Sequence, residues 1–342
     1  MIQTLTGFNR PVSAKFNADG TKLYVVNRAR GEVGVTRHEG SVSMVTVDKD
    51  GKMGRPNHRF VTRLTGPTDL AVSPISFGKI PRGAVFIVTG TPLIQTESGR
   101  ITKDASQEFI GLVIADANTG QTLQRIDLSP KSKLKLQSAH SLVSPSSIEF
   151  DSKGNLYIGD TGIGGHLFQP RVQGKSRIWK IDRRGVMDLV AGISPTDVKP
   201  IGLTSLPGAM CYDSKSDSIF FITNHNQGAP SGSVFKVPAM SFTNMASMQT
   251  IVRELPALSG LKISPQGRVL MVSNSGELLL PKGRKDSREI RFRPPRRFTT
   301  PGKFGIATNS GGEVILAIPE EGSDAGVNKG QSLQVAKLSS EY

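Results

Sequence analysis

Short apolar runs separated by turn residues repeat along the whole chain. The clearest case lies at residues 145–165, where Ile148 and Phe150 precede the turn at 151–154 and a second apolar run follows at 156–158. Asp bonds its own backbone and Gly accepts positive φ, so this stretch predicts a β-hairpin. The same pattern recurs at a spacing of about fifty residues, and no helical period is sustained for three turns. The pattern therefore predicts an all-β fold.

Six such units align along the 342 residues. The first five have four strands each, whereas the sixth has three before the chain stops. The N-terminal run at residues 1–6 supplies the missing strand, which would close a ring of sheets and remove its exposed edges. We expect one six-bladed β-propeller domain over residues 1–342, with blades at 11–65, 66–128, 144–192, 206–255, 257–293 and 302–342 plus 1–6.

Three details of this alignment are specific enough to be checked. In the third unit, the turn at 182–185 is followed by a predicted strand at 186–191. In the second unit, residues 91–108 form an insertion that we expect to be a loop on one rim. In the sixth unit, the apolar run predicts a second strand at 314–318.

Two of the hairpins resemble known propeller repeats. Residues 154–162, GNLYIGDTG, resemble the NHL repeat, and residues 19–27, DGTKLYVVN, resemble the YVTN-type repeat. The resemblance covers nearly the whole chain at the level of blades and implies a six-bladed propeller. It implies no particular activity, because propellers host many unrelated functions.

Polar residues end the predicted second strands at one level. As channel-mouth residues, they would bind a polar ligand, or Ca or another divalent cation, through side-chain oxygens. As strand-end residues, they would cap loops and form local turns. Both interpretations stay open for the set Asn27, Thr89, Asp160, Asn224 and Asn274.

The repeats are also distantly similar to those of gluconolactonase-like propellers. That resemblance implies metal ligands at the start of the innermost strands, and an oxygen-ligand site needs two or three converging carboxylate or amide groups. None of the matching residues is Asn, Asp or Glu, so the metal-ligand positions are not matched: they are Val12, Thr68, Ser146, Gly208, Ser259 and Phe304.

Two histidines follow predicted second strands. His166 comes shortly after Asp160, and His225 directly follows Asn224. If their loops are equivalent, the two imidazoles would form a metal or acid–base pair at the channel mouth, with Asp160 as a further catalytic candidate. The alternative is that they are isolated loop histidines.

The chain is strongly basic, with a net charge of +15 and a pI of about 10. Residues 282–303 hold nine Lys or Arg against Asp286 and Glu289, which predicts an anion-binding surface or a solvated outer strand. Only Phe292 and Phe298 interleave, so base stacking of the nucleic-acid type is weakly supported. The proposed binding residues are Arg284, Lys285, Arg288, Arg291, Arg293, Arg296 and Arg297.

These observations favour a non-catalytic binding or scaffold propeller, which presents loops and the basic segment to a protein or anionic partner. The alternative is a metal-dependent hydrolase or lyase, similar to lactonases, with its site at the channel mouth. The single cysteine, Cys211, excludes an intramolecular disulfide. Residues 1–5 show no signal peptide and no window is apolar enough to span a membrane, so a cytoplasmic protein and the mature form of an exported one both stay open.

Overall fold

The computed structural model describes most of the chain, namely residues 3–29, 35–36, 38–90, 94–95, 101–102, 109–134, 141–166, 169–172, 175–224, 232–280, 290–292, 301–321 and 331–338. In these residues the regular structure is β-strand, apart from the helix α1 (Arg183–Val190) and a 3-10 turn at Met245–Ser247. Six four-stranded antiparallel sheets form the blades of a six-bladed β-propeller, which confirms the predicted fold class.

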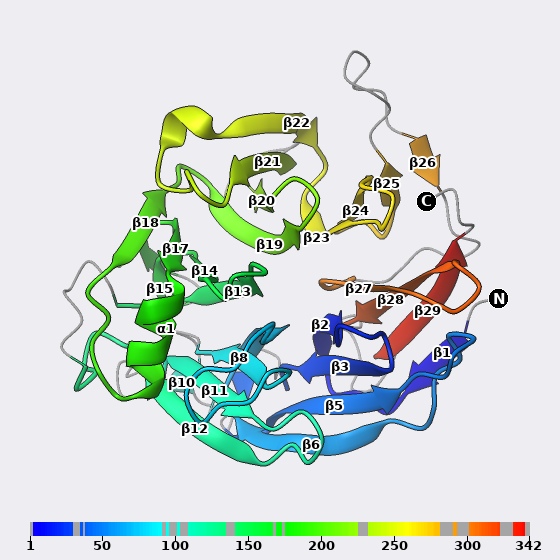
Figure 1. The fold of residues 1–342 in the computed structure, drawn as a ribbon, viewed down its shortest axis with the longest axis horizontal. Helices are drawn as coiled ribbons and strands as arrows, with labels where there is room; N and C mark the ends of the chain where they lie inside the picture. The colour runs from blue at the N-terminus through cyan, green and yellow to red at the C-terminus, as the bar shows by residue number, and fades with distance from the viewer. Residues whose placement is uncertain are drawn as a thin grey trace. The chain divides into compact units, whose positions relative to one another are not determined.

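The blades are numbered 1 to 6 in chain order, and their strands, apart from β7, are labelled in Figure 1. Blade 1 consists of β2 (Pro11–Phe16), β3 (Lys22–Asn27), β5 (Gly40–Thr46) and β6 (Asn57–Leu64). Blade 2 consists of β7 (Pro67–Val72), β8 (Val85–Thr89), β11 (Gly111–Ala115) and β12 (Thr122–Asp127). Blade 3 consists of β13 (Pro145–Phe150), β14 (Leu156–Asp160), β17 (Arg177–Ile181) and β18 (Val198–Gly202). Blade 4 consists of β19 (Leu206–Asp213), β20 (Ser218–Asn224), β21 (Gly232–Pro238) and β22 (Gln249–Leu255). Blade 5 consists of β23 (Leu258–Ile263), β24 (Val269–Ser273), β25 (Leu278–Leu280) and β26 (Ile290–Phe292). Blade 6 consists of β27 (Gly305–Thr308), β28 (Val314–Glu320), β29 (Ser332–Leu338) and β1 (Gln3–Thr6).

The N-terminal strand completes the last blade, as the strand count predicts. β1 pairs antiparallel with β29, from Gln3 opposite Val335 to Thr6 opposite Ser332, and the two strands lie side by side in Figure 1. The hydroxyl of Thr4 also donates to the side-chain oxygen of Gln334 at 2.8 Å. The two ends of the chain are thus held in one sheet.

The hairpin between β13 and β14 has the turn chemistry that the sequence predicts. The carboxylate of Asp151 accepts the backbone N–H groups of Lys153 at 3.0 Å and Asn155 at 2.9 Å. Gly154 has a φ of 86°, a conformation that favours glycine. Asp151 therefore satisfies the backbone of the predicted turn, and Gly154 supplies its positive φ.

The predicted strand at 186–191 is wrong. Residues 183–190 form the helix α1, and the fourth strand of blade 3 is β18 instead. Asp182 caps the helix by accepting the backbone N–H of Gly185 at 2.7 Å, and Val186 and Leu189 are buried at helical spacing. An Asp that precedes an apolar run starts a helix as readily as a tight turn, and here burial of one helical face decides between them.

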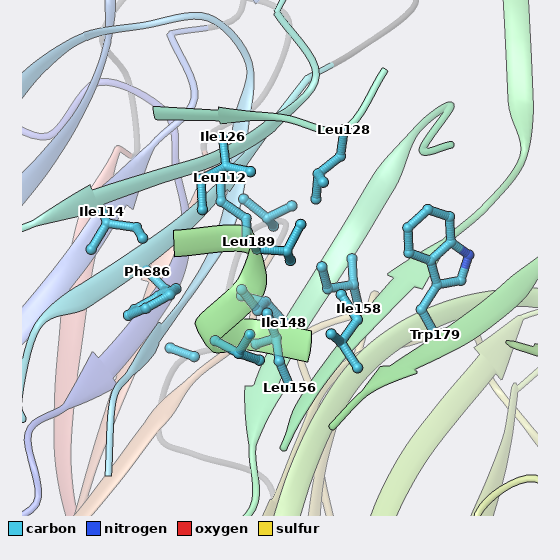
Figure 2. Packing of buried hydrophobic residues seen from close by; sticks show 14 of the residues in the cluster. Phe86, Leu112, Ile114, Ile126, Leu128, Ile148, Leu156, Ile158, Trp179 and Leu189 are labelled. Atoms are coloured by element: carbon cyan, nitrogen blue, oxygen red, sulfur yellow. The ribbon is translucent and has the colours of Figure 1, made fainter. Parts of the chain in front are cut away.

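The chain divides into two compact units, each with its own core. Unit 1 comprises Met1–Val25, Ser43–His58 and Gly208–Tyr342, and unit 2 comprises Val26–Val42 and Arg59–Pro207. The core of unit 2 joins blades 2 and 3, with Trp179, Ile148 and Phe86 among its buried side chains, and Leu189 of α1 packs into the same cluster. Figure 2 shows this cluster. The prediction of a single domain stays a prediction.

Short extra strands of unit 2 follow the second strands of blades 1, 2 and 3. The insertion at 91–108, which was expected to be a loop, contains the short strands β9 (Ile94–Gln95) and β10 (Ile101–Thr102). β9 pairs in parallel with β4 (Val35–Thr36), which follows β3 along the chain and lies outside the sheet of blade 1. In blade 3, β15 (Ile163–His166) pairs with β16 (Gln169–Val172) as a hairpin. No helix among the described residues is long and apolar enough to span a membrane.

Candidate functional site

All six second strands end on a polar residue, and in blade 5 this residue is Ser273, which precedes the predicted Asn274. Antiparallel pairing places the end of each second strand at the same edge of its blade as the start of the first strand, as Asp160 opposite Pro145 shows in blade 3. Glu320 ends β28 and was missed, because the apolar run stops at Ile318 while the strand continues through Pro319. The strand-end residues are Asn27, Thr89, Asp160, Asn224, Ser273 and Glu320.

Among these strand-end residues, Asp160 accepts several hydrogen bonds and lies beside a cationic side chain. Its side chain is fully buried. The backbone N–H groups of Val143 and Ser144 donate to its two oxygens at 3.1 and 2.7 Å, and that of Gly162 donates at 3.2 Å. The Arg177 guanidinium lies 3.6 Å from the same carboxylate. The charge is thus held by three backbone donors and one cation.

Arg177 connects Asp160 to the segment that enters blade 3. Its guanidinium donates to the carbonyl oxygen of Ser141. The centre of the guanidinium also lies 5.0 Å from the ring centroid of Trp179, which is fully buried. Packing on an indole ring favours one orientation of the planar guanidinium. Arg177 therefore has a fixed position next to the carboxylate.

The hairpin β15–β16 begins at Ile163, three residues after Asp160. Before β15, Thr161 donates from its backbone N–H to the carbonyl oxygen of Ser144 at 3.0 Å and from its hydroxyl at 3.2 Å. After β16, the hydroxyl of Ser176 donates to the carbonyl oxygen of Thr161 at 2.8 Å. Both stems of the hairpin are therefore tied to the Asp160 edge. His166 ends β15 opposite Gln169 in the register.

The other two predicted residues of unit 2 are also buried. The side-chain nitrogen of Asn27 donates to the hydroxyl of Ser41 at 3.2 Å, within blade 1. The hydroxyl of Thr89 has no hydrogen-bond partner among the described residues, although the residue is only 1% exposed. Buried hydroxyls are usually satisfied, so a buried hydroxyl without a partner is unusual.

In unit 1, the predicted Asn224 binds backbone, and Glu320, which was not predicted, binds neighbouring side chains. Asn224 donates to the carbonyl oxygen of Leu258 at 2.9 Å and accepts its N–H at 2.9 Å, which joins blade 4 to blade 5. Asn274 lies one residue beyond β24 and is exposed. Glu320 accepts from the hydroxyl of Ser332 at 2.6 Å and from the amide of Gln334 at 2.8 Å.

Several predicted residues cannot be placed in this geometry. The backbone of Arg291 lies in β26 opposite Leu279, and the basic segment around it stays a prediction. The predicted residues outside the described ones are His225, Arg284, Lys285, Arg288, Arg293, Arg296 and Arg297.

The six positions at the starts of the first strands that match metal ligands carry no carboxylate or amide group, which are the groups that a divalent cation prefers. At two of the positions that would carry metal ligands, a hydroxyl donates to a backbone carbonyl instead: Thr68 to Pro145 at 3.0 Å and Ser146 to Pro207 at 2.8 Å. No group of three or more His, Cys, Asp or Glu side chains in the described ranges is arranged to hold a metal ion. These residues do not fit the metal site that the resemblance implies.

No known protein family and no curated protein matches the chain in sequence. Solved structures match it over almost its full length. A gluconolactonase from Xanthomonas campestris has 11% identity and a TM-score of 0.55, covering 98% of this chain and 90% of its own. A luciferin-regenerating enzyme has 10% identity and a TM-score of 0.58, covering 99% and 96%. A putative oxidoreductase (glucose dehydrogenase) from Thermus thermophilus has 15% identity and a TM-score of 0.56, covering 99% of both chains.

These likenesses concern the fold alone. The chain is distantly similar to gluconolactonase-like propellers in its architecture, and at 10–15% identity the likeness carries no residue roles. The chemistry has to be argued from the residues of this chain.

Proposed function

We propose that the chain is a hydrolase of the lactonase-like propeller class, which opens a small polar lactone or ester at the Asp160 edge of blade 3. The fold supports this class over a purely structural role, since the similar propellers include proteins named as enzymes. The observation that carries the proposal is the anchored hairpin β15–β16, both of whose stems are tied to the edge that Asp160 organises.

Asp160 acts as a positioning residue in this proposal. Its oxygens already accept three backbone N–H groups and lie beside Arg177. A carboxylate whose oxygens already accept these bonds acts by holding its donors in place. Its effect is to fix the segments at 141–144 and 161–162, between which a substrate carbonyl would be oriented. Rigid placement of reacting groups lowers the activation barrier because less entropy is lost on reaching the transition state.

His166 is the proposed general base. It ends β15, on the hairpin that the Asp160 edge anchors. Imidazole is a common general base, and in this proposal it accepts a proton from water as that water attacks the acyl carbon. Hydrolysis adds water across the acyl carbon–oxygen bond and yields a carboxylate, a hydroxyl group and one proton. A general base contributes about 10²- to 10⁴-fold to such a reaction.

The proposal uses no metal step. In related chemistry a divalent cation polarises the carbonyl and generates hydroxide at neutral pH. The starts of the first strands in this chain hold hydroxyl, aliphatic or aromatic residues, or glycine, and two of the hydroxyls bind backbone carbonyls. The reaction is therefore assigned to protein side chains.

Proton release during hydrolysis tests this function. We would incubate the purified chain with a panel of five- and six-membered lactones, sugar lactones and aryl esters, with and without EDTA, and follow acid release in a pH-stat. We expect turnover of at least one lactone, and a loss of turnover in Asp160→Ala. Absence of turnover across the panel, in both conditions, would overturn the proposal.

A second candidate function is binding of an anionic partner through residues 282–303. The observation that favours it is the nine Lys or Arg in this segment, which carries about half of the +15 net charge. Association with heparin or an acidic protein should weaken with salt. It should also weaken when Arg291, Arg293, Arg296 and Arg297 become Ser, and unchanged binding in that variant would remove this candidate.

A further inference from the structure

A surface hollow lies at the edge of blade 3 opposite to the one that carries Asp160. It has a volume of about 370 Å³ and is lined by Asn155, Asp182, Arg183, Arg184 and Met187. The hollow forms where the turn between β13 and β14 meets the first turn of α1. Since the predicted strand at 186–191 is a helix, this hollow could not be foreseen from the sequence.

Hydrogen bonds fix the positions of Asn155 and Asp182, two of the residues that line the hollow. The Asn155 side chain donates to the carboxylate of Asp151 at 2.7 Å and accepts the backbone N–H of Arg183 at 2.9 Å. Asp182 accepts the N–H of Gly185, and Tyr157 donates to the Asp151 carboxylate at 3.1 Å. These bonds hold the backbone that carries the two arginines.

The residues that line the hollow include two cationic side chains and one exposed apolar side chain. Arg183 and Arg184 are exposed, and neither guanidinium is paired with an acidic side chain among the described residues. Met187 follows Arg183 by one helical turn, on the same face of α1, and is 43% exposed. Two unpaired guanidinium groups next to an exposed thioether side chain suit a ligand with carboxylates beside an apolar group.

We propose that this hollow is a docking site for an acidic peptide segment of a partner protein. Glutamate or aspartate side chains bind Arg183 and Arg184, and a neighbouring apolar side chain packs on Met187. A single-stranded nucleic acid is less favoured, because the lining residues include no aromatic side chain on which a base would stack. The site is independent of the proposed hydrolysis, since Asp160 and the hollow lie at opposite ends of β14.

Fluorescence anisotropy tests this site on the full chain. The probe is a fluorescein-labelled octapeptide that alternates glutamate and leucine, and a glutamine-for-glutamate peptide is the control. We expect the probe to bind wild type, and Arg183→Ser/Arg184→Ser to weaken it at least about tenfold, because two charge-assisted contacts are lost. Met187→Ser should weaken it by a smaller factor.

The matched control is Lys49→Ser/Lys52→Ser, which removes two exposed positive charges between β5 and β6 of blade 1 instead. We expect this variant to bind the probe as wild type does. The proposal is overturned if Arg183→Ser/Arg184→Ser binds the probe normally, if the glutamine peptide binds equally well, or if the Lys49/Lys52 variant loses as much binding as Arg183→Ser/Arg184→Ser. Both arginines of the hollow are exposed, so circular dichroism should show an unchanged fold. The readout is binding, so it is distinguishable from any failure of turnover.

Discussion

The hydroxyl of Thr68 donates a hydrogen bond to the carbonyl oxygen of Pro145, 3.0 Å away, and so joins the first strands of blades 2 and 3. The next residue continues this connection, since the carboxylate of Asp69 accepts the backbone N–H of Ile148 at 3.2 Å. In gluconolactonase-like propellers the position of Thr68 would carry a metal ligand. In this chain it stabilises the contact between neighbouring blades.

Replacing Thr68 should therefore lower stability. Thr68→Val keeps the shape of the side chain but leaves a buried carbonyl oxygen without this donor, which costs about 1–2 kcal/mol. Urea unfolding at neutral pH measures the change, with Thr122→Val on the exposed face of β12 as the control. Equal unfolding free energies for Thr68→Val and wild type would contradict the assigned role.

Metal chelation should leave the fold unaffected. Because the starts of the first strands hold no carboxylate or amide group, we expect dialysis against EDTA to leave the melting temperature unchanged. A melting temperature that falls after dialysis, and that calcium or zinc restores, would show a structural cation that this donor set does not account for.

Asp160 should be the most sensitive single position of the candidate site. Asp160→Asn removes the charge beside Arg177, and breaking a buried ion pair in this way costs about 3–5 kcal/mol. The hairpin that depends on Gly162 and Thr161 should also open more often. Hydrogen exchange of residues 161–176, measured by mass spectrometry, should quicken in the variant, whereas exchange in blade 4 should change less. Unchanged exchange at 161–176 would contradict the anchoring role.

His58 should make the stability of unit 1 depend on pH. Burial lowers the pKa of His58 below its usual 6.5, an effect that Arg55 reinforces and a hydrogen bond with the Thr6 backbone opposes. Its Nδ1 lies 3.2 Å from the hydroxyl of Ser43, and its ring packs edge-on against Phe8 at 5.0 Å between centroids. The neutral imidazole is therefore the form that the folded chain favours.

The sign of the effect follows from this depressed pKa. The unfolded chain binds a proton at His58 near pH 6.5 and the folded chain does so only at lower pH, so the stability from this residue is present above 6.5 and is lost as the pH falls below it. Urea unfolding at pH 7.5 and 5.5 should show a larger loss for wild type than for His58→Gln. His38→Gln, at an exposed histidine, should behave as wild type. An equal loss in wild type and His58→Gln would contradict this assignment.

The repeated hairpins and the spare N-terminal strand were enough to predict the propeller. The turn at Asp151 and the pairing of Gln3 with Val335 are local or terminal features, which the alternating pattern reveals directly. The helix α1 was not predicted, because eight residues give too few turns to establish a helical period and Asp182 suits a turn as well as a cap.

The candidate site was predicted only in part. Asp160 was identified from its place after an apolar run, but its contact with Arg177 depends on the register between β14 and β17, which the sequence does not encode locally. Glu320 was missed because Pro319 is an unusual strand residue. The structure shows that Pro319 pairs with Leu333, so the strand continues to the carboxylate.

The most direct test of the proposed hydrolysis compares kcat/KM of wild type, His166→Ala and His38→Ala on the best lactone of the panel. The account predicts turnover by wild type and a loss of about 10²- to 10⁴-fold in His166→Ala. His38→Ala should retain the wild-type value, since it removes a histidine of unit 2 that has no role in the proposal. Wild-type activity in His166→Ala, or no lactone turnover by any of the three proteins, would contradict the account.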